Sequence, residues 1–182
     1  MSKFALTMFV ITAVGTLAHA QDQGEMFMTS AGFLAISTPV GFKQADGPME
    51  ILFTPGGKPF GKTESFIYVA TVRVGKDTQY PDLSAFIDFD VKSFRDRFPT
   101  GGTNRETPIE LKHSRTQVPA WTFRSGEKKN AFERLVFLQD VNHLVWLLVL
   151  SANTEKEFNQ HLSAFERFVQ SYKGSILVGQ PK

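Results

Sequence analysis

Seven consecutive apolar residues, Leu144 to Leu150, place the tightest constraint on how this chain folds. The run reads LVWLLVL, and the side chains of a strand point alternately to the two faces of its sheet. A strand that is apolar at every position must therefore be covered on both faces. A short polar turn separates it from the apolar segment 130–138, so the two segments predict an antiparallel hairpin near the middle of a sheet.

Shorter apolar segments predict further strands on either side of this hairpin. Residues 65–74 alternate apolar and partly polar side chains, as expected of a strand with two different faces. Clusters of Pro, Gly and polar residues separate the segments and mark turns. The expected strands, in chain order, are 33–42 (broken by turn residues), 49–53, 65–74, 108–113, 119–125, 130–138 and 143–152.

A change of period predicts a helix from Asp82 to Phe98. Apolar residues recur there at steps of three and four, which places them along one side of a helix. Asp82 can accept hydrogen bonds from the free amides at the helix start, and residues 99–102 stop the helix with Pro and Gly. The expected apolar stripe is Leu83, Ile87, Val91, Phe94 and Phe98.

A second helix is predicted to begin at a capping box, in which Thr154 closes the helix start and Glu157 reaches back to it. Gly174 is placed to end this helix. Its expected apolar stripe is Phe158, Leu162, Phe165, Phe168, Val169 and Tyr172. The order of strands, helix, strands and helix predicts an α+β fold. We expect a central antiparallel sheet of about six or seven strands flanked by helices, an α/β/α sandwich.

Residues 1–20 have the three parts of a secretory signal. A basic start at Lys3 precedes an apolar run of about 14 residues, which is shorter than the roughly 20 that span a bilayer, and Ala18-His19-Ala20 follows. We therefore expect cleavage after Ala20 and a periplasmic or secreted protein without a stable membrane anchor. Residues 21–31 are then the mature N-terminal segment, 32–174 a single domain and 175–182 a C-terminal tail. The chain contains no Cys, so neither a lipid-modified cysteine nor a disulfide is expected.

The composition argues against nucleic acid as a partner. Without the signal, 19 basic and 18 acidic residues nearly balance. Arg124, Lys128, Lys129 and Arg134 form a basic patch on one hairpin, which we interpret as a solvated strand rim because acidic residues are mixed with the basic ones. The 18 Phe residues predict a large aromatic core, with an aromatic ligand cavity as the alternative.

One segment matches the phosphate-loop pattern literally: Gly56, four residues, then Gly61, Lys62 and Thr63. That motif binds phosphates only when a helix follows, because the amides at the helix start cradle the anion. Here residues 64–69 have the alternation of a strand, and Pro59 removes one amide from the loop. We interpret the segment as a glycine-rich hairpin loop and expect no nucleotide or other cofactor.

No residues are predicted to form a catalytic or metal site. His113, His143 and His161 follow the signal without metal-like spacing, so we expect structural histidines. No serine lies in a Gly-x-Ser-x-Gly elbow. Asp88 and Asp90 are two apart on a helix, so their carboxylates should diverge instead of forming a pair.

Short phrases and the order of elements resemble the PsbP/Mog1/DcrB-like superfamily over roughly Gly32 to Lys173. The phrases are 36–42 (ISTPVGF) and 118–120 (VPA), followed by the long hairpin and the closing Phe-rich helix. Where many relatives have Gly before the second phrase, this chain has Gln117. The resemblance implies a central antiparallel sheet flanked by helices and a mostly non-enzymatic role. No metal-binding or partner-binding residues of that superfamily can be matched here.

Three functions are therefore considered. The first is an exported, non-catalytic accessory or binding protein with a protein partner in the cell envelope. The second is a carrier that holds an apolar small ligand in a cavity between the sheet and a Phe-rich helix. The third is a hydrolase-like enzyme, which an open pocket holding His113 or His143 beside a carboxylate would favour.

Overall fold

A computed structural model of the protein describes residues 24–126 and 131–177. The expected signal sequence, residues 1–20, lies outside the described residues, as do Lys128 and Lys129 of the basic hairpin. The descriptions below refer to the two described ranges.

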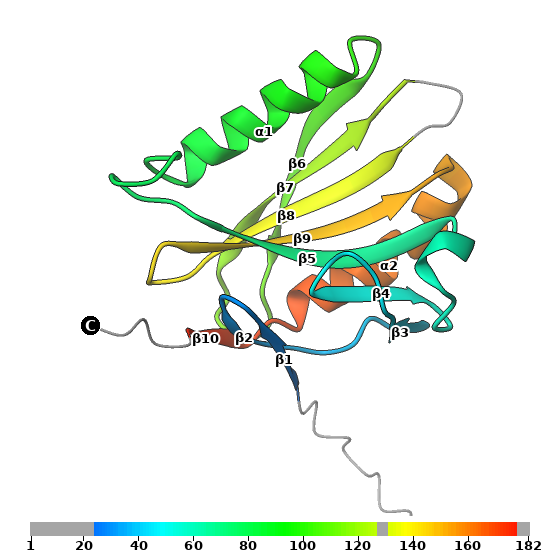
Figure 1. The fold of residues 1–182 in the computed structure, drawn as a ribbon, viewed down its shortest axis with the longest axis horizontal. Coiled ribbons are helices and arrows are strands. Elements are labelled where there is room, and N and C mark those ends of the chain that lie inside the picture. The colour runs from blue at the N-terminus through cyan, green and yellow to red at the C-terminus, as the bar shows by residue number, and fades with distance from the viewer. Residues whose placement is uncertain (1–23, 127–130, 178–182) are drawn as a thin grey trace, which may run out of the picture.

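The described chain is built around a seven-stranded antiparallel sheet with the order β3-β4-β5-β9-β8-β7-β6 (Figure 1). β9 holds the run that is apolar at every position, and it lies at the centre of this order. β9 pairs with β8 in an antiparallel hairpin, as predicted, and with β5 on its other side. The predicted α+β class is also confirmed. The strands are β3 (Phe42–Gln44), β4 (Ile51–Pro55), β5 (Ser65–Arg73), β6 (Gly102–Glu110), β7 (Gln117–Arg124), β8 (Phe132–Gln139) and β9 (Leu144–Ala152).

A second, three-stranded sheet was not predicted. It has the order β1-β2-β10, with β1 (Glu25–Thr29), β2 (Gly32–Ile36) and β10 (Gly174–Leu177). The single strand expected over 33–42 is thus two strands in different sheets, because Pro39 and the positive φ of Gly41 (84°) turn the chain between them. β1 and β10 come from the segments expected to be a mature N-terminal segment and a tail.

The two predicted helices are present as α1 (Leu83–Arg97) and α2 (Glu155–Gln170). Asp82 Oδ1 accepts a hydrogen bond from the Ala85 amide at 2.9 Å, and Thr154 Oγ1 accepts one from the Glu157 amide at 3.2 Å. These side chains satisfy amides that have no partner within their helices. The predicted end of α2 is wrong, because Ser171 caps the helix and Gly174, at φ 148°, begins β10.

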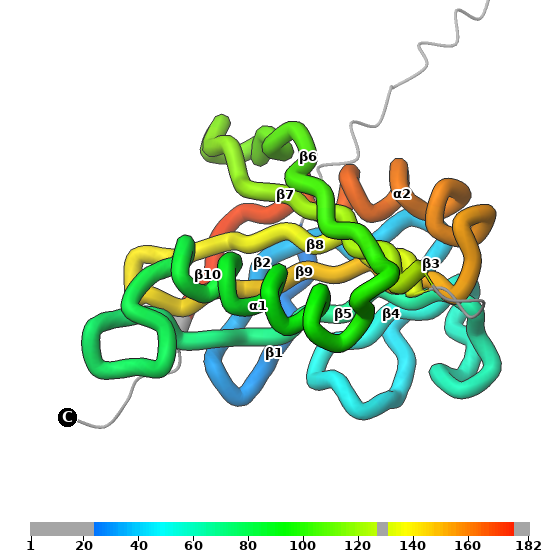
Figure 2. The backbone as a smooth tube through the Cα atoms, turned by 90° about the horizontal axis from the view of Figure 1, so that it is seen from above, coloured from blue at the N-terminus to red at the C-terminus, as the bar shows by residue number. Residues whose placement is uncertain are grey.

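The two faces of the large sheet are covered by different elements. α1 lies over one face, while α2 and the small sheet lie against the other (Figures 1 and 2). The alternation of β9 divides its side chains between these layers: Trp146, Leu148 and Leu150 join the α2 core, and Val145 and Val149 join the α1 core. The prediction that both faces of this strand are buried is confirmed.

Candidate functional site

A cleft of about 340 Å³ opens between α1 and the sheet face that it covers. α1 crosses in front of the central strands (Figure 2), and its C-terminal half forms one wall of the cleft. Four neighbouring strands, β5, β9, β8 and β7, contribute the opposite wall. The lining residues are Asp90, Ser93, Phe94, Arg97 and Phe98 from α1 and its end, and Tyr68, Leu147, Ala131, Glu133, Leu135 and Phe123 from the sheet side.

Aromatic rings form a continuous part of this lining. The ring centroid of Phe94 lies 4.9 Å from that of Phe98 and 4.7 Å from that of Phe123, with both pairs tilted. Phe94 and Phe98 belong to the apolar stripe predicted for the first helix, while Phe123 is buried on β7. The stripe therefore helps to line a cleft at its C-terminal end in addition to packing on the sheet.

Two carboxylates from different elements face this cleft. Burial raises the pKa of Asp90 on α1 to about 6, and its Oδ2 atom is buried without a hydrogen-bond partner among the described residues. Burial and the nearby charge of Asp90 both raise the pKa of Glu133 on β8. Two opposing effects, a hydrogen bond from Ser151 and the charge of Arg97, lower the pKa of Glu133.

The surrounding strands hold Glu133 in place. Glu133 is the direct cross-strand partner of Ser151 on β9, and the Ser151 hydroxyl donates to Glu133 Oε1 at 3.4 Å. Tyr68 on β5 lies in the same lining, and burial together with the charges of Glu133 and Asp90 raises the pKa of its phenol. Three acidic groups thus share one cleft, where burial opposes the ionisation of each, the charge of Asp90 opposes that of Glu133, and both carboxylates oppose that of Tyr68.

The sequence analysis singled out Asp90 but not its partner. Asp88 is exposed while Asp90 lines the cleft, so the two carboxylates of the helix do diverge. Asp90 nevertheless has a carboxylate neighbour, because folding brings Glu133 opposite it. A signal for Glu133 does exist in the sequence: it is an acidic residue on the same side of β8 as the buried Leu135 and Phe137.

The phosphate-loop match forms the connection between β4 and β5. Gly56 and Gly57 have positive φ values of 64° and 80°, and Lys62 ends a 3-10 turn, η1 (Phe60–Lys62). β5 begins at Ser65 immediately afterwards, so this loop leads into a strand, and the helix start that the motif needs is replaced by sheet. Gly61 and Thr63 belong to the same loop.

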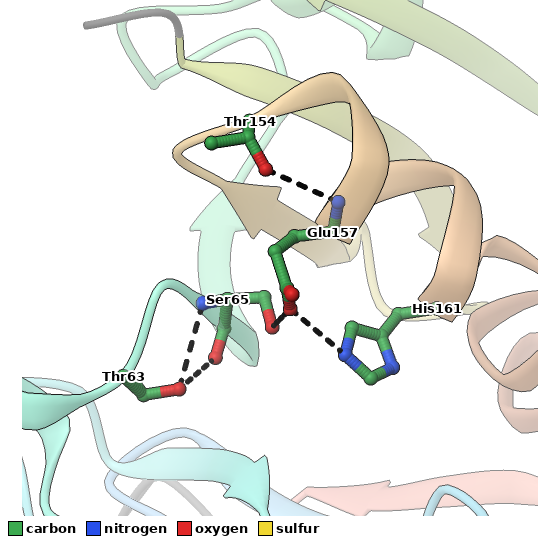
Figure 3. Close-up of polar contacts among 5 residues, drawn as sticks. All are labelled: Thr63, Ser65, Thr154, Glu157 and His161. Carbon is green, nitrogen blue, oxygen red and sulfur yellow. Dashed lines mark hydrogen bonds and ion pairs between the residues drawn. The ribbon is translucent and has the colours of Figure 1, made fainter.

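After the loop, a polar contact joins Ser65, the first residue of β5, to α2, and the Thr63 hydroxyl bonds the backbone of Ser65 (Figure 3). The Ser65 hydroxyl donates to Glu157 Oε2 at 3.3 Å, and His161 Nε2 lies 3.4 Å from the same oxygen. Glu157 therefore turns toward Ser65 and His161, and the predicted return of its side chain to the helix start is wrong. A hydrolytic triad places the histidine between serine and acid, whereas here the acid lies in the middle and Ser65 is 0% exposed. The contact ties α2 to β5.

The other predicted histidines lie apart from the cleft. His113 lines a hollow of about 220 Å³ together with Lys112, Gln170, Ser171 and Lys173. His143 occupies the turn between β8 and β9 with φ 61°. Neither arrangement places a carboxylate in a pocket beside the imidazole, as the hydrolase alternative requires.

One member of the predicted basic rim is buried instead of solvated. Arg134 is 9% exposed on β8, and its guanidinium lies 3.6 Å from Glu106 Oε2 on β6. Arg124 is more exposed and pairs with Glu155 at 3.4 Å. The expectation of a solvated rim is wrong for Arg134, because its side chain lies on the same face of β8 as Phe132 and Val136, which belong to the α2 core.

No helix of residues 24–126 or 131–177 is long and apolar enough to cross a membrane. In the same part of the chain, His, Asp and Glu side chains do not gather in groups of three or more that could hold a metal ion.

No protein-family model and no curated protein matches the chain. Among solved structures, cyanobacterial PsbP (CyanoP) from Synechocystis sp. PCC 6803 is similar over 88% of this chain and 98% of its own, with 10% sequence identity and a TM-score of 0.49. A Pseudomonas aeruginosa protein of unknown function, PA94, is similar over 88% of this chain and 99% of its own, with 12% identity and a TM-score of 0.43.

Proposed function

We propose that this chain is an exported, non-catalytic binding protein that holds a small molecule in the cleft between α1 and the sheet. The observation that carries the proposal is the convergence of Asp90 and Glu133 in an aromatic-lined cleft, where one oxygen of Asp90 is buried without a partner. The ligand would have an apolar body for the aromatic wall and a polar end for the carboxylates.

The cleft has the size of a small-molecule site and contains polar groups that could orient a ligand. Such sites are concave and mostly apolar, of roughly 300–1,000 Å³, with a few polar groups that orient the ligand. The cleft lies at the lower end of this range at about 340 Å³. Placing two carboxylates there costs stability, since desolvation and like charge both oppose ionisation. A ligand that pairs with the carboxylates would recover this cost.

The hydrolase alternative makes a different use of the same carboxylates. A general acid and a general base can be two carboxyl groups whose pKa values are shifted by their surroundings. Catalysis also needs a substrate bond placed between them, and it predicts turnover that depends on Asp90. Hydrolysis of glycoside or ester substrates by the purified protein, lost in Asp90→Asn, would overturn the binding proposal.

A cleft-filling variant tests the proposal directly. Ser93→Phe adds a ring to the α1 wall without removing a carboxylate, and Ser84→Phe is the control because Ser84 is exposed on the same helix. Titration of isotope-labelled protein with small phenyl-bearing amines and alcohols should shift the amide signals of residues 90–98 and 133–135. Ser93→Phe should abolish these shifts and Ser84→Phe should preserve them. Absence of shifts in the unmodified protein for every probe would refute a ligand site in this cleft.

Export and a protein partner in the cell envelope stay predictions. The signal-like residues 1–20 support export, and N-terminal sequencing of exported protein should find Gln21 first. Recovery of the full-length chain from a membrane fraction would contradict this. The partner is tested by pull-down of the mature protein from its own envelope fraction, with heat-denatured protein as the control.

A further inference from the structure

Asp90 lines the cleft with a carboxyl group that lacks hydrogen-bond donors. Its Oδ2 atom is buried and has no partner among the described residues, whereas Glu133 in the same lining receives a donor from Ser151. Buried acceptors in folded proteins nearly always have a donor. A molecule that occupies the cleft is therefore favoured if it brings an N–H or O–H group to Asp90.

The charges around the cleft also favour a particular ligand. With both carboxylates ionised, Asp90 and Glu133 contribute two negative charges and Arg97 contributes one positive charge, so the lining is left with one negative charge. Arg97 is exposed, and its guanidinium carbon lies 5.1 Å from the centroid of the Phe98 ring. In the described ranges neither carboxylate is joined to a cation by a salt bridge. One additional positive charge would balance the lining.

The aromatic wall selects among possible cations. Phe94 and Phe98 line the cleft with partly exposed rings against which an apolar body can pack, and the buried ring of Phe123 lies beneath Phe94. A calcium ion instead takes about six to eight oxygen ligands, which this lining does not supply. A quaternary ammonium would balance the charge but has no N–H group for Asp90.

Resting on the proposed function, we infer that the ligand of this cleft is a protonated primary or secondary amine, or an amidinium, carried on an apolar body. Its N–H groups donate to Asp90 and Glu133, and its body packs against Phe94 and Phe98. The cation takes the place of the proton that the carboxylate pair would otherwise hold.

Binding of such a cation depends on pH in a defined direction. The titratable and charged groups that face Asp90 are Arg97 from α1, Tyr68 from β5 and Glu133 from β8, with the Ser151 hydroxyl from β9 behind Glu133. Arg97 stays charged, and the raised pKa of Tyr68 keeps its phenol protonated. Asp90, with a pKa of about 6, must lose its proton to pair with an ammonium ion. Affinity for an amine should therefore fall by about tenfold between about pH 7.5 and pH 5.

Three matched probes test the chemical class: 2-phenylethylamine, 2-phenylethanol and N,N,N-trimethyl-2-phenylethylammonium. They share a phenyl body and differ in charge and in the presence of a hydrogen-bond donor. By calorimetry or chemical-shift titration at about pH 7.5, the amine should bind at least about tenfold more tightly than the other two. Asp90→Asn should remove this preference while binding of the alcohol changes little. Asp88→Asn, two residues away on the exposed side of α1, should behave like the unmodified protein.

The other possible outcomes overturn either the amine inference or the proposed function. Equal affinity for amine and alcohol would overturn the amine inference and leave the cleft as a ligand site. Equal affinity for the quaternary ammonium would overturn the requirement for a donor to Asp90. Displacement of the amine by stoichiometric calcium chloride would overturn the amine inference and identify the ligand as a metal ion. Failure of all three probes, with no shift at residues 90–98, would refute the proposed function itself. Glu133→Gln offers a second test of the amine preference if Asp90→Asn does not fold.

Discussion

Asp90→Asn should make the protein more stable at neutral pH, which is unusual for a change to a half-buried polar residue. Burial raises the pKa of Asp90 from its ordinary value of 3.8 to about 6, so the native state favours the neutral acid. Above this pKa the folded protein must hold an ionised carboxylate in a poorly solvated place. Asparagine has nearly the same shape and carries no charge, so it removes this cost.

The magnitude and sign follow from proton linkage. Between pH 3.8 and about 6 the native state binds more protons at Asp90 than the unfolded state. The contribution of this group to the free energy of unfolding therefore decreases as pH rises through this window and is constant above it. A pKa change of this size corresponds to at most about 3 kcal/mol. Partial exposure of the side chain to water reduces our expectation to about 1–2 kcal/mol.

Urea titrations of the original protein, Asp90→Asn and Asp88→Asn at several pH values measure this effect. The difference between Asp90→Asn and the original should be small near pH 4 and reach about 1–2 kcal/mol in favour of the variant by about pH 7.5. Titrating groups distant from Asp90 are shared and largely cancel in this difference. Loss of the Asp90 charge also eases the ionisation of Glu133, which acts in the same direction, and exposed Asp88 serves as the control. A variant that is less stable than the original at neutral pH, or a difference that does not change with pH, would show that Asp90 is not held in a desolvated cleft.

Three further substitutions test the rest of the structure. Phe165→Ala should destabilise the protein by about 3–5 kcal/mol in denaturant titrations, because this fully buried ring packs α2 on the sheet. An effect below that of a surface substitution would mean that α2 is not part of the core. Thr154→Ala should cost about 1 kcal/mol by removing the acceptor for the Glu157 amide, and an unchanged midpoint would count against this cap. Lys62→Ala should change neither the unfolding midpoint nor the response to ATP in calorimetry, since its loop leads into β5. ATP binding by the original that disappears in this variant would restore the phosphate-loop interpretation.

The elements with strong local patterns could be predicted from the sequence. The helices begin where Asp82 and Thr154 accept backbone amides, and the run from Leu144 to Leu150 lies at the centre of the sheet with both faces covered. These features depend on periodicity and capping, which act over a few residues. The hydrophobic pattern was weaker at the edge of the sheet. β6 begins at Gly102, whereas the predicted strand began at 108, because an exposed edge strand has few buried side chains to mark it.

The small sheet depended on contacts between distant parts of the chain. β10 pairs with β2 from Gly174 opposite Ala35 to Leu177 opposite Gly32, and β1 adds to the other edge of β2. Segments of four or five residues do not specify such partners locally, since backbone pairing can be made with any exposed strand edge.

The candidate site was decided almost entirely by tertiary structure. The sequence by itself determined that Asp90 and Asp88 point in different directions, since residues two apart on a helix do not face each other. Only the packing of α1 across β5, β9 and β8 brought Asp90 to Glu133 and Tyr68 and enclosed the three groups beside aromatic rings. Desolvation and charge coupling act through space, so the raised pKa values and the unsatisfied oxygen of Asp90 arise only when the layers assemble.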